Sequence, residues 1–136
     1  MTDPLMDQAR QAAERAYAPY SGFRVGAALL AEDGTVYTGA NVENAAYPSS
    51  SCAEATAVGT AVSAGARKFR AVAVACIDAK TVEGAYPCGR CRQILLEFGV
   101  PRVLVGTAEG EVREHSLDEL LPHGFKLGEP TDSRSH

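Results

Sequence analysis

Long hydrophobic runs are absent from this 136-residue chain. The longest uninterrupted apolar stretches, at residues 25–31 and 71–77, have seven residues each, whereas a membrane-spanning helix needs roughly 20. The first twenty residues carry charges of both signs throughout and hold no continuous apolar segment of the kind that a secretory signal requires. We therefore expect no membrane span and no secretory leader, and we expect the protein in the cytoplasm.

An excess of basic residues is also missing, because 13 lysines and arginines stand against 17 aspartates and glutamates. The resulting net charge of −4 offers no electrostatic footprint for a polyanion. Nucleic acid is therefore not expected as a partner, and enzymes that act on polynucleotides are disfavoured for the same reason.

Large aromatic side chains are scarce, since the chain has no tryptophan, five tyrosines and four phenylalanines. Alanine supplies 23 positions and glycine 13, so the interior is expected to form by close approach of small side chains. The length indicates one domain, able to bury roughly two thirds of its unfolded surface without disulfides. In a reducing compartment, the four cysteines are better interpreted as metal ligands, catalytic groups or buried apolar residues.

Periodicity and turn signals predict the helices and strands of an α/β domain. Apolar residues at helical spacing favour an amphipathic helix that Pro19 ends, and Asp33-Gly34 between two β-type runs favours a hairpin. A continuously apolar run at 70–77 predicts a central, buried strand. The predicted elements are helices at 3–17, 52–64, 91–98 and 116–121, the last with a Ser116/Glu119 capping box, and strands at 24–31, 35–40, 70–77, 102–107 and 112–115. Residues 1–127 make up the domain, and residues 128–136, which have no apolar side chains to bury, are expected to be a mobile tail.

Two short motifs stand where loops enter predicted helices: CAE at residues 52–54 and PCGRC at residues 87–91. The second could be a redox pair, but a catalytic zinc site takes three protein ligands and a water. The histidines have no metal-type spacing and are interpreted as surface residues, while Cys76 shares a strand face with two valines, as a small buried hydrophobe would. Cys52 is therefore the better third ligand beside Cys88 and Cys91, because helix N-termini favour thiolates at all three positions.

Glu54 has two interpretations. Residues 51–54 fit an S-x-x-E capping box, so the glutamate could simply close the N-terminus of its helix. Alternatively, a carboxylate two residues from a zinc thiolate can reach a water on the metal without being a ligand, and can then act as general acid and base. Zinc deaminases divide the work in this way, with Cys₃ or His/Cys₂ ligands and a glutamate that does not bind the metal.

The CAE and PCGRCRQ motifs, together with YAPYSGFRVGAAL, NVENAAY and DELLPHGF, resemble the cytidine deaminase family, specifically its small, homotetrameric Cys₃ zinc form. The resemblance covers about residues 10–126. It implies a single-domain, five-stranded mixed β-sheet sandwiched by helices. It also implies hydrolytic deamination of cytidine and deoxycytidine to the corresponding uridines in pyrimidine salvage, with one Zn²⁺ per chain and active sites shared between subunits.

The resemblance also implies a role for each matching residue. Three thiolates, those of Cys52, Cys88 and Cys91, hold zinc, and Glu54 moves protons. The substrate-binding positions are Asn41 and Glu43 for a ribose hydroxyl, Phe23 beside the pyrimidine, the Ala53 backbone for the base, and Tyr47 and Phe125 in a neighbouring subunit's pocket.

One position departs from the commoner family pattern, in which arginine follows the glutamate, because this chain has Ala55 there. A zinc ion with three thiolates carries a net negative charge, so nearby positive charge should govern how readily hydroxide forms. Arg90 and Arg92 flank Cys91 within one helical turn, and we expect charge compensation from them, with Arg92 favoured.

Two other functions remain open. A deaminase of another aminopyrimidine compound, such as blasticidin S, would share CAE and PCGRCRQ and would also lack that arginine, although the NVEN motif favours a nucleoside. A non-catalytic binding module would use Cys76 as a fourth thiolate and leave no open coordination position.

Overall fold

The computed structural model describes residues 3–127, and the tail predicted at 128–136 lies outside this range. Its strands form one five-stranded sheet in the order β2-β1-β3-β4-β5, with β3 and β4 parallel and the other neighbours antiparallel. Among these residues, no helix is both long and apolar enough to cross a membrane. The elements are α1 (Pro4–Ala13), β1 (Val25–Ala31), β2 (Val36–Ala40), the 3₁₀ turn η1 (Tyr47–Ser49), α2 (Ala53–Ser63), β3 (Phe69–Cys76), the 3₁₀ turn η2 (Val82–Ala85), α3 (Gly89–Glu97), β4 (Arg102–Gly106), β5 (Val112–Ser116) and α4 (Leu117–Leu120).

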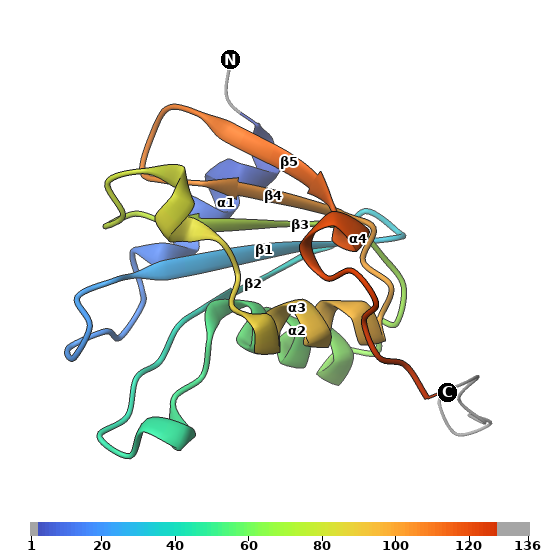
Figure 1. Cartoon of the computed structure of the whole chain (residues 1–136), viewed down its shortest axis with the longest axis horizontal. Helices are drawn as coiled ribbons and strands as arrows, with labels where there is room; N and C mark the ends of the chain where they lie inside the picture. The colour runs from blue at the N-terminus through green and yellow to red at the C-terminus, as the bar shows by residue number, and fades with distance from the viewer. Residues whose placement is uncertain (1–2, 128–136) are drawn as a thin grey trace.

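Helices cover both faces of the sheet (Figure 1). The helix α1 packs on one face, over a core of Met6, Ala9, Ala28, Ala71, Ala73, Ala75 and Leu104. The helices α2 and α3 lie side by side on the other face, over a larger core that includes Leu29, Ala57, Val72, Val74, Leu95, Val103 and Val105. The predicted fold, a mixed five-stranded sheet sandwiched by helices, is confirmed.

Small residues allow α1 and α2 to approach the sheet closely. A Cβ atom at Gly39 of β2 would lie 2.7 Å from the carbonyl oxygen of Ala53 in α2 and closer still to the amide nitrogen of Ala57. A Cβ atom at Gly26 of β1 would collide with the backbone of Ala9 in α1. The expectation that small side chains build the interior is confirmed at both faces.

The first helix is shorter than its periodicity predicts. It ends at Ala13 instead of residue 17. Beyond this point the chain turns toward the end of β2, where the Tyr17 N–H donates to the Asn41 carbonyl and the Glu43 N–H donates to the Tyr17 carbonyl. This long-range pairing takes precedence over the local helical pattern.

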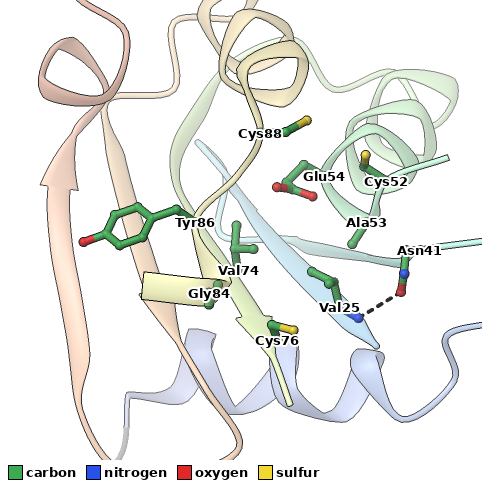
Figure 2. Close-up of a pocket in the computed structure, with 11 residues that line it drawn as sticks. Val25, Asn41, Cys52, Ala53, Glu54, Val74, Cys76, Gly84, Tyr86 and Cys88 are labelled. Atoms are coloured by element: carbon green, nitrogen blue, oxygen red, sulfur yellow. Dashed lines mark hydrogen bonds between the residues drawn. The ribbon is translucent and has the colours of Figure 1, made fainter. Parts of the chain in front are cut away.

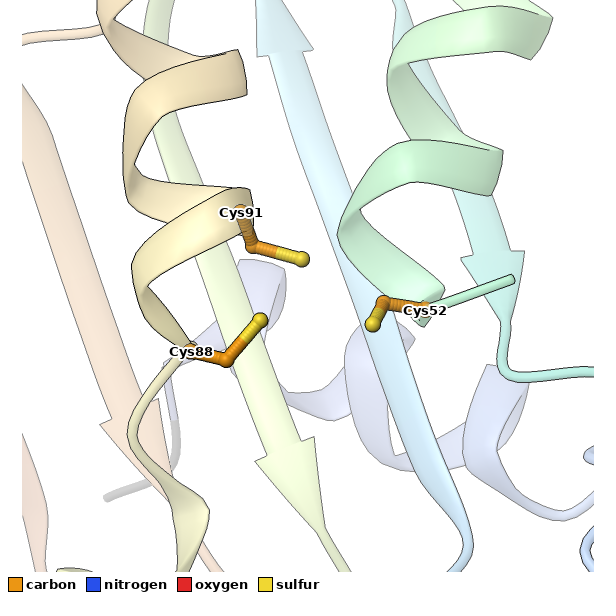
Figure 3. A group of neighbouring side chains, drawn as sticks. All are labelled: Cys52, Cys88 and Cys91. Carbon is orange, nitrogen blue, oxygen red and sulfur yellow. The ribbon is translucent and has the colours of Figure 1, made fainter. Parts of the chain in front are cut away.

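Three further local predictions are confirmed. Gly34 adopts a φ of +94° in the predicted turn between β1 and β2, and β3 is the central strand. Ser116 and Glu119 form both hydrogen bonds of the predicted capping box at α4. The outcome that matters for function is that the first turns of α2 and α3 lie side by side (Figure 3).

Candidate active site

Three cysteine side chains converge between the N-termini of α2 and α3 (Figure 3). Cys52 is the N-cap residue of α2, Cys88 is the N-cap residue of α3, and Cys91 lies in the first turn of α3. Their Sγ atoms all lie within 4.8 Å of one another. Tetrahedral zinc with Zn–S bonds of about 2.3 Å separates its sulfur ligands by about 3.8 Å, so these three residues, called here the thiol cluster, fit a zinc ion.

Cys76 is not part of this cluster. It is 2% exposed at the end of β3, within the core that contains Val72 and Val74. Burial raises the pKa of its thiol, as expected for a small apolar residue. Within residues 3–127, the Cys₄ arrangement on which a non-catalytic zinc module would depend is therefore not present.

The thiol cluster favours negative charge at Cys52. The pKa of Cys52 falls to about 6, mainly because the Cys91 thiol donates a hydrogen bond to it, with further contributions from Cys88 and from the positive charge of Arg90. The pKa of Cys91 rises in turn, because this residue supplies the proton and is itself buried. Deprotonated sulfur is the form that binds a metal.

Glu54 is the buried acidic residue of the site, at 4% exposure in the first turn of α2. Burial raises the pKa of its carboxyl group to about 7, and the charge of Cys52 adds to this effect. The capping interpretation of Glu54 is wrong, because the N-cap residue is Cys52 and the Ser51 hydroxyl pairs with Thr56 Oγ1 at 3.0 Å instead. The capping box that residues 51–54 predict is therefore not formed.

A cavity of about 180 Å³ adjoins the thiol cluster and Glu54 (Figure 2). Its floor comes from the ends of β1 and β3, and one side comes from the segment that joins β3 to α3. The lining residues are Val25, Asn41, Cys52, Ala53, Glu54, Val74, Cys76, Gly84, Ala85, Tyr86 and Cys88. The cavity therefore combines an apolar floor with a metal-binding cluster and a buried carboxyl group.

Asn41 and Glu43 lie where a second cavity, of about 220 Å³, adjoins the first. The Asn41 amide is held in place, since its oxygen accepts from the Val25 N–H at 2.8 Å (Figure 2) and its nitrogen donates to the Phe23 carbonyl at 2.9 Å. The Glu43 carboxylate accepts from the N–H groups of Tyr20 and Ser21 and from the Ser21 hydroxyl. The Ser21 hydroxyl is the main reason why the pKa of Glu43 is lowered.

The other predicted substrate contacts are dispersed. Ala53 is fully buried at the start of α2, and Tyr47 lines the second cavity while remaining 74% exposed. Phe23 and Phe125 are half or more exposed and line neither cavity within residues 3–127. Phe125 is tied to α3, because Gln93 Nε2 donates to its carbonyl at 2.6 Å.

The two arginines beside Cys91 occupy different environments. Arg92 donates through Nε to the Pro87 carbonyl at 2.8 Å and through Nη1 to the Leu120 carbonyl at 2.7 Å, so its guanidinium is bound by backbone carbonyl groups. Arg90 is the arginine whose charge lowers the pKa of Cys52. This differs from the expectation that favoured Arg92.

Sequence reasoning did not identify Tyr86 and Cys76 as cavity-lining residues. Cys76 was assigned to the core, where it does lie, but the same residue also reaches the cavity floor. Tyr86 directly precedes the PCGRC motif, which is the one signal that could have placed it near the site.

A thiol cluster beside a buried carboxyl group that is not one of its ligands, at the wall of a cavity, defines the class of zinc-dependent deaminases. The family model described as "Cytidine and deoxycytidylate deaminase zinc-binding region" matches residues 2–107. The chain belongs to this family. Zinc is therefore its cofactor, and the thiol cluster provides a site that fits the ion.

Individual relatives agree with this assignment. The chain is 47% identical to a cytidine deaminase of Sporosarcina psychrophila over 125 residues, which cover 90% of each protein. It is 45% identical to a cytidine deaminase of Halalkalibacterium halodurans over 94% of this chain and 96% of the relative. The crystal structure of a cytidine deaminase from Burkholderia pseudomallei superimposes with a TM-score of 0.83 at 45% identity, covering 92% of this chain and all of that one.

Proposed function

We propose that the protein hydrolyses cytidine and deoxycytidine to uridine and deoxyuridine with release of ammonia, and serves pyrimidine salvage in the cytoplasm. The observation that carries the proposal is the position of Glu54, which is buried beside the thiol cluster at the wall of a cavity. Relatives named cytidine deaminase, nearly half identical over 90% or more of the chain, support the same substrate.

The metal is held by Cys52, Cys88 and Cys91. When bound, zinc supplies an open fourth position at which a water becomes more acidic. Cys52 and Cys88 are the N-cap residues of α2 and α3, so their sulfurs lie at the positive ends of two helix dipoles, which favours the thiolate form.

Glu54 carries the protons. Its carboxylate takes a proton from the attacking water and delivers it to N3 of the base, and it then passes the second proton to the amino group at C4, which leaves as ammonia. The low exposure of Glu54 suits this role, because burial brings its pKa to about 7, close to the pH at which it must both accept and release a proton.

Asn41 and Glu43 bind the ribose hydroxyl, with Phe23 beside the pyrimidine and the Ala53 backbone against the base. Asn41 has two amide hydrogens, and the one not used by the Phe23 carbonyl is available to the sugar. A carboxylate offers about four acceptor positions, and Glu43 uses three of them within the chain. Each residue is thus held in place and retains capacity for one more hydrogen bond.

A nucleoside fits the two cavities better than a nucleotide. Within residues 3–127 no lysine or arginine lines either cavity, and Glu43 adds negative charge to the second one. A 5′-phosphate would therefore lack the charged hydrogen-bond donors that usually bind it.

Charge compensation at the zinc site comes mainly from Arg90 and also from Arg92, whose guanidinium binds the carbonyl of Pro87, the residue before Cys88. The influence of Arg90 on Cys52 supports placing the main contribution there. Ala55 leaves the position of the more usual family arginine without charge.

We also propose a homotetramer whose active sites are shared. Large aromatic side chains at the surface support this proposal, because Tyr47 and Phe125 are 74% and 66% exposed. Side chains of this size gain stability when a partner covers them, and both could then complete a neighbour's cavity.

The decisive experiment mixes the purified protein with cytidine and follows the loss of cytidine absorbance, with deoxycytidine, the 5′-monophosphate and blasticidin S in parallel. Turnover of the two nucleosides, with little of the other compounds, is the expected result. Preferential turnover of blasticidin S would replace the proposed substrate, and no turnover of any compound by zinc-loaded protein would contradict the enzymatic function.

A further inference from the structure

The segment that joins β3 to α3 forms one wall of the first cavity. Residues 82–86, called here the wall segment, contain the short turn η2 and Tyr86. Three of them, Gly84, Ala85 and Tyr86, line the cavity. Gly84 and Tyr86 lie on the side opposite Cys52 and Asn41 (Figure 2). The position of this segment therefore sets the space available to a bound base.

The inner side of the wall segment is apolar. Val82 and Ala85 are 5% and 3% exposed and belong to the core between the sheet and α2 and α3. Apolar contacts of this kind are not directional, and one 3₁₀ turn has poor internal hydrogen-bond geometry. A more specific contact is therefore needed to fix the position of the wall segment.

Tyr86 supplies this anchor, because its ring points away from the cavity toward the sheet edge formed by β5 (Figure 2). Its hydroxyl lies 2.7 Å from Nε2 of His115 in β5, and the two rings pack at a centroid distance of 5.3 Å. The Glu119 carboxylate is 3.7 Å from Nδ1 of His115 and also accepts from the Ser116 N–H at the start of α4. A carboxylate on that side favours a proton on Nδ1, so that Nε2 accepts and the Tyr86 hydroxyl donates.

A second tie joins the same two elements. Arg113, two residues before His115 in β5, forms an ion pair with Glu83 at 2.9 Å. The Glu83 and Tyr86 side chains therefore connect the wall segment to β5 on either side of Gly84 and Ala85, the two small residues at the cavity. Arg113 and Glu83 are both substantially exposed, so the half-buried pair of Tyr86 and His115 is the more specific of the two ties.

The metal-binding side of this loop is held separately. The Pro87 carbonyl accepts from Arg92, which also donates to the Leu120 carbonyl at the end of α4. Cys88, which follows Pro87, is thus fixed through α3 and α4 without the help of Tyr86. Loosening the wall segment should therefore affect the cavity more than the thiol cluster.

We propose that Tyr86 and His115 are paired positioning residues that fix the wall of the nucleoside cavity and so determine how tightly the nucleoside is held. The proposal rests on the proposed function. Neither residue belongs to the thiol cluster or transfers protons to the substrate, and a wall contacts the ground state and the transition state alike. Loss of the pair should therefore raise KM and leave kcat nearly unchanged.

The test compares Tyr86→Phe, His115→Leu and the double variant with the wild type, by steady-state kinetics on cytidine, calorimetric binding of uridine and zinc content. Each single variant should raise KM and the uridine Kd about three- to tenfold, the effect expected for one lost hydrogen bond. The loss in the double variant should be clearly smaller than the sum of the two single losses, because both single variants remove the same hydrogen bond. His115→Gln, whose amide oxygen can still accept from the Tyr86 hydroxyl, should restore most of the binding.

Glu114→Gln is the matched control, because Glu114 neighbours His115 on β5 but pairs with Arg102 of β4 instead. Its KM should equal that of the wild type. An unchanged KM and uridine Kd in Tyr86→Phe, additive losses in the double variant, or a fall in kcat and zinc content with KM unaltered would each overturn the proposal. If the wild type did not turn over cytidine, the proposed function would fail, while uridine binding by the same variants would still decide the role of the pair.

Discussion

Replacing Gly39 with alanine should disturb the active site from beneath α2. The new Cβ atom would lie 2.7 Å from the Ala53 carbonyl oxygen and 2.9 Å from the carbonyl carbon of Thr56, whereas carbon atoms in contact are normally about 3.5 Å apart or more. The obstructing atoms are backbone, so no change of side-chain rotamer can relieve the clash. The first turn of α2, which carries Glu54, must therefore move by about 1 Å.

Both stability and activity should fall by measurable amounts. Overpacking costs about 1–3 kcal/mol, and the smaller entropy of an alanine-containing unfolded chain offsets up to about 1 kcal/mol of it, so we take a net loss of about 2 kcal/mol. For a chain of this length, an unfolding entropy of about 2.1 cal/mol/K per residue converts that loss into a fall in Tm of about 7 °C. A displacement of about 1 Å at a catalytic group lowers kcat about 10²-fold.

Gly26→Ala is the matched control for this prediction. Gly26 is on the adjacent strand and packs against α1, on the face of the sheet that carries none of the proposed site residues. Thermal unfolding should show that both variants are destabilised, while kinetics well below both midpoints should show a loss of kcat in Gly39→Ala alone. A Gly39→Ala enzyme with a kcat within twofold of the wild type, or an equal loss of kcat in Gly26→Ala, would refute the reasoning.

Four further outcomes are expected. Replacing any cysteine of the thiol cluster with serine should abolish zinc binding in metal analysis, whereas Cys76→Ala should retain one zinc per chain. Glu54→Gln should keep its zinc and its Tm but lose at least 10² to about 10⁴ in kcat, the usual contribution of a positioned proton-transfer group; near-normal turnover would contradict its role. Light scattering should give a tetramer, and Phe125→Ala should raise KM; a fully active monomer would contradict the shared site. Asp78→Asn should lower Tm at neutral pH, because the hydrogen bond from Arg24 lowers the pKa of Asp78 and so stabilises the folded state when Asp78 is ionised. This stabilisation is fully present above the ordinary pKa of aspartate and is lost as the pH falls through the lowered pKa. The variant and the wild type should therefore have the same Tm in acid.

Local signals predicted much of the fold and the composition of the thiol cluster. Cys52, Cys88 and Cys91 could be recognised because a helix N-terminus is encoded within a few residues, and a thiol placed there has a defined direction and charge preference. The Asp33-Gly34 turn and the Ser116 capping box are likewise encoded by residues within a few positions of one another. The turn, the capping box and each helix N-terminus taken singly depend on residues close together in the sequence, whereas the meeting of Cys52 with Cys88 and Cys91 depends on the fold.

Features that depend on distant partners could not be predicted in this way. Helix α1 ends early because Tyr17 pairs with the end of β2, and no periodicity within residues 3–17 contains that information. Arg92 was expected over the sulfurs, but its guanidinium binds the carbonyl of Leu120, 28 residues further along the chain. The partner of Tyr86 lies 29 residues away on β5. In each case, the fold decides among several contacts that the sequence alone leaves possible.

The placement of Cys52 and Cys88 as N-cap residues makes the metal a cross-link as well as a cofactor. Neither cap side chain forms a hydrogen bond to its helix, so the ion bound by both sulfurs joins the starts of α2 and α3, 36 residues apart along the chain. By the loop-closure argument used for disulfides, a tie of this span stabilises the folded chain by about 4 kcal/mol. A chelator strong enough to stop turnover should therefore also lower the melting temperature, and mutations that weaken the α2–α3 contact should reduce the affinity for zinc before they affect the chemistry.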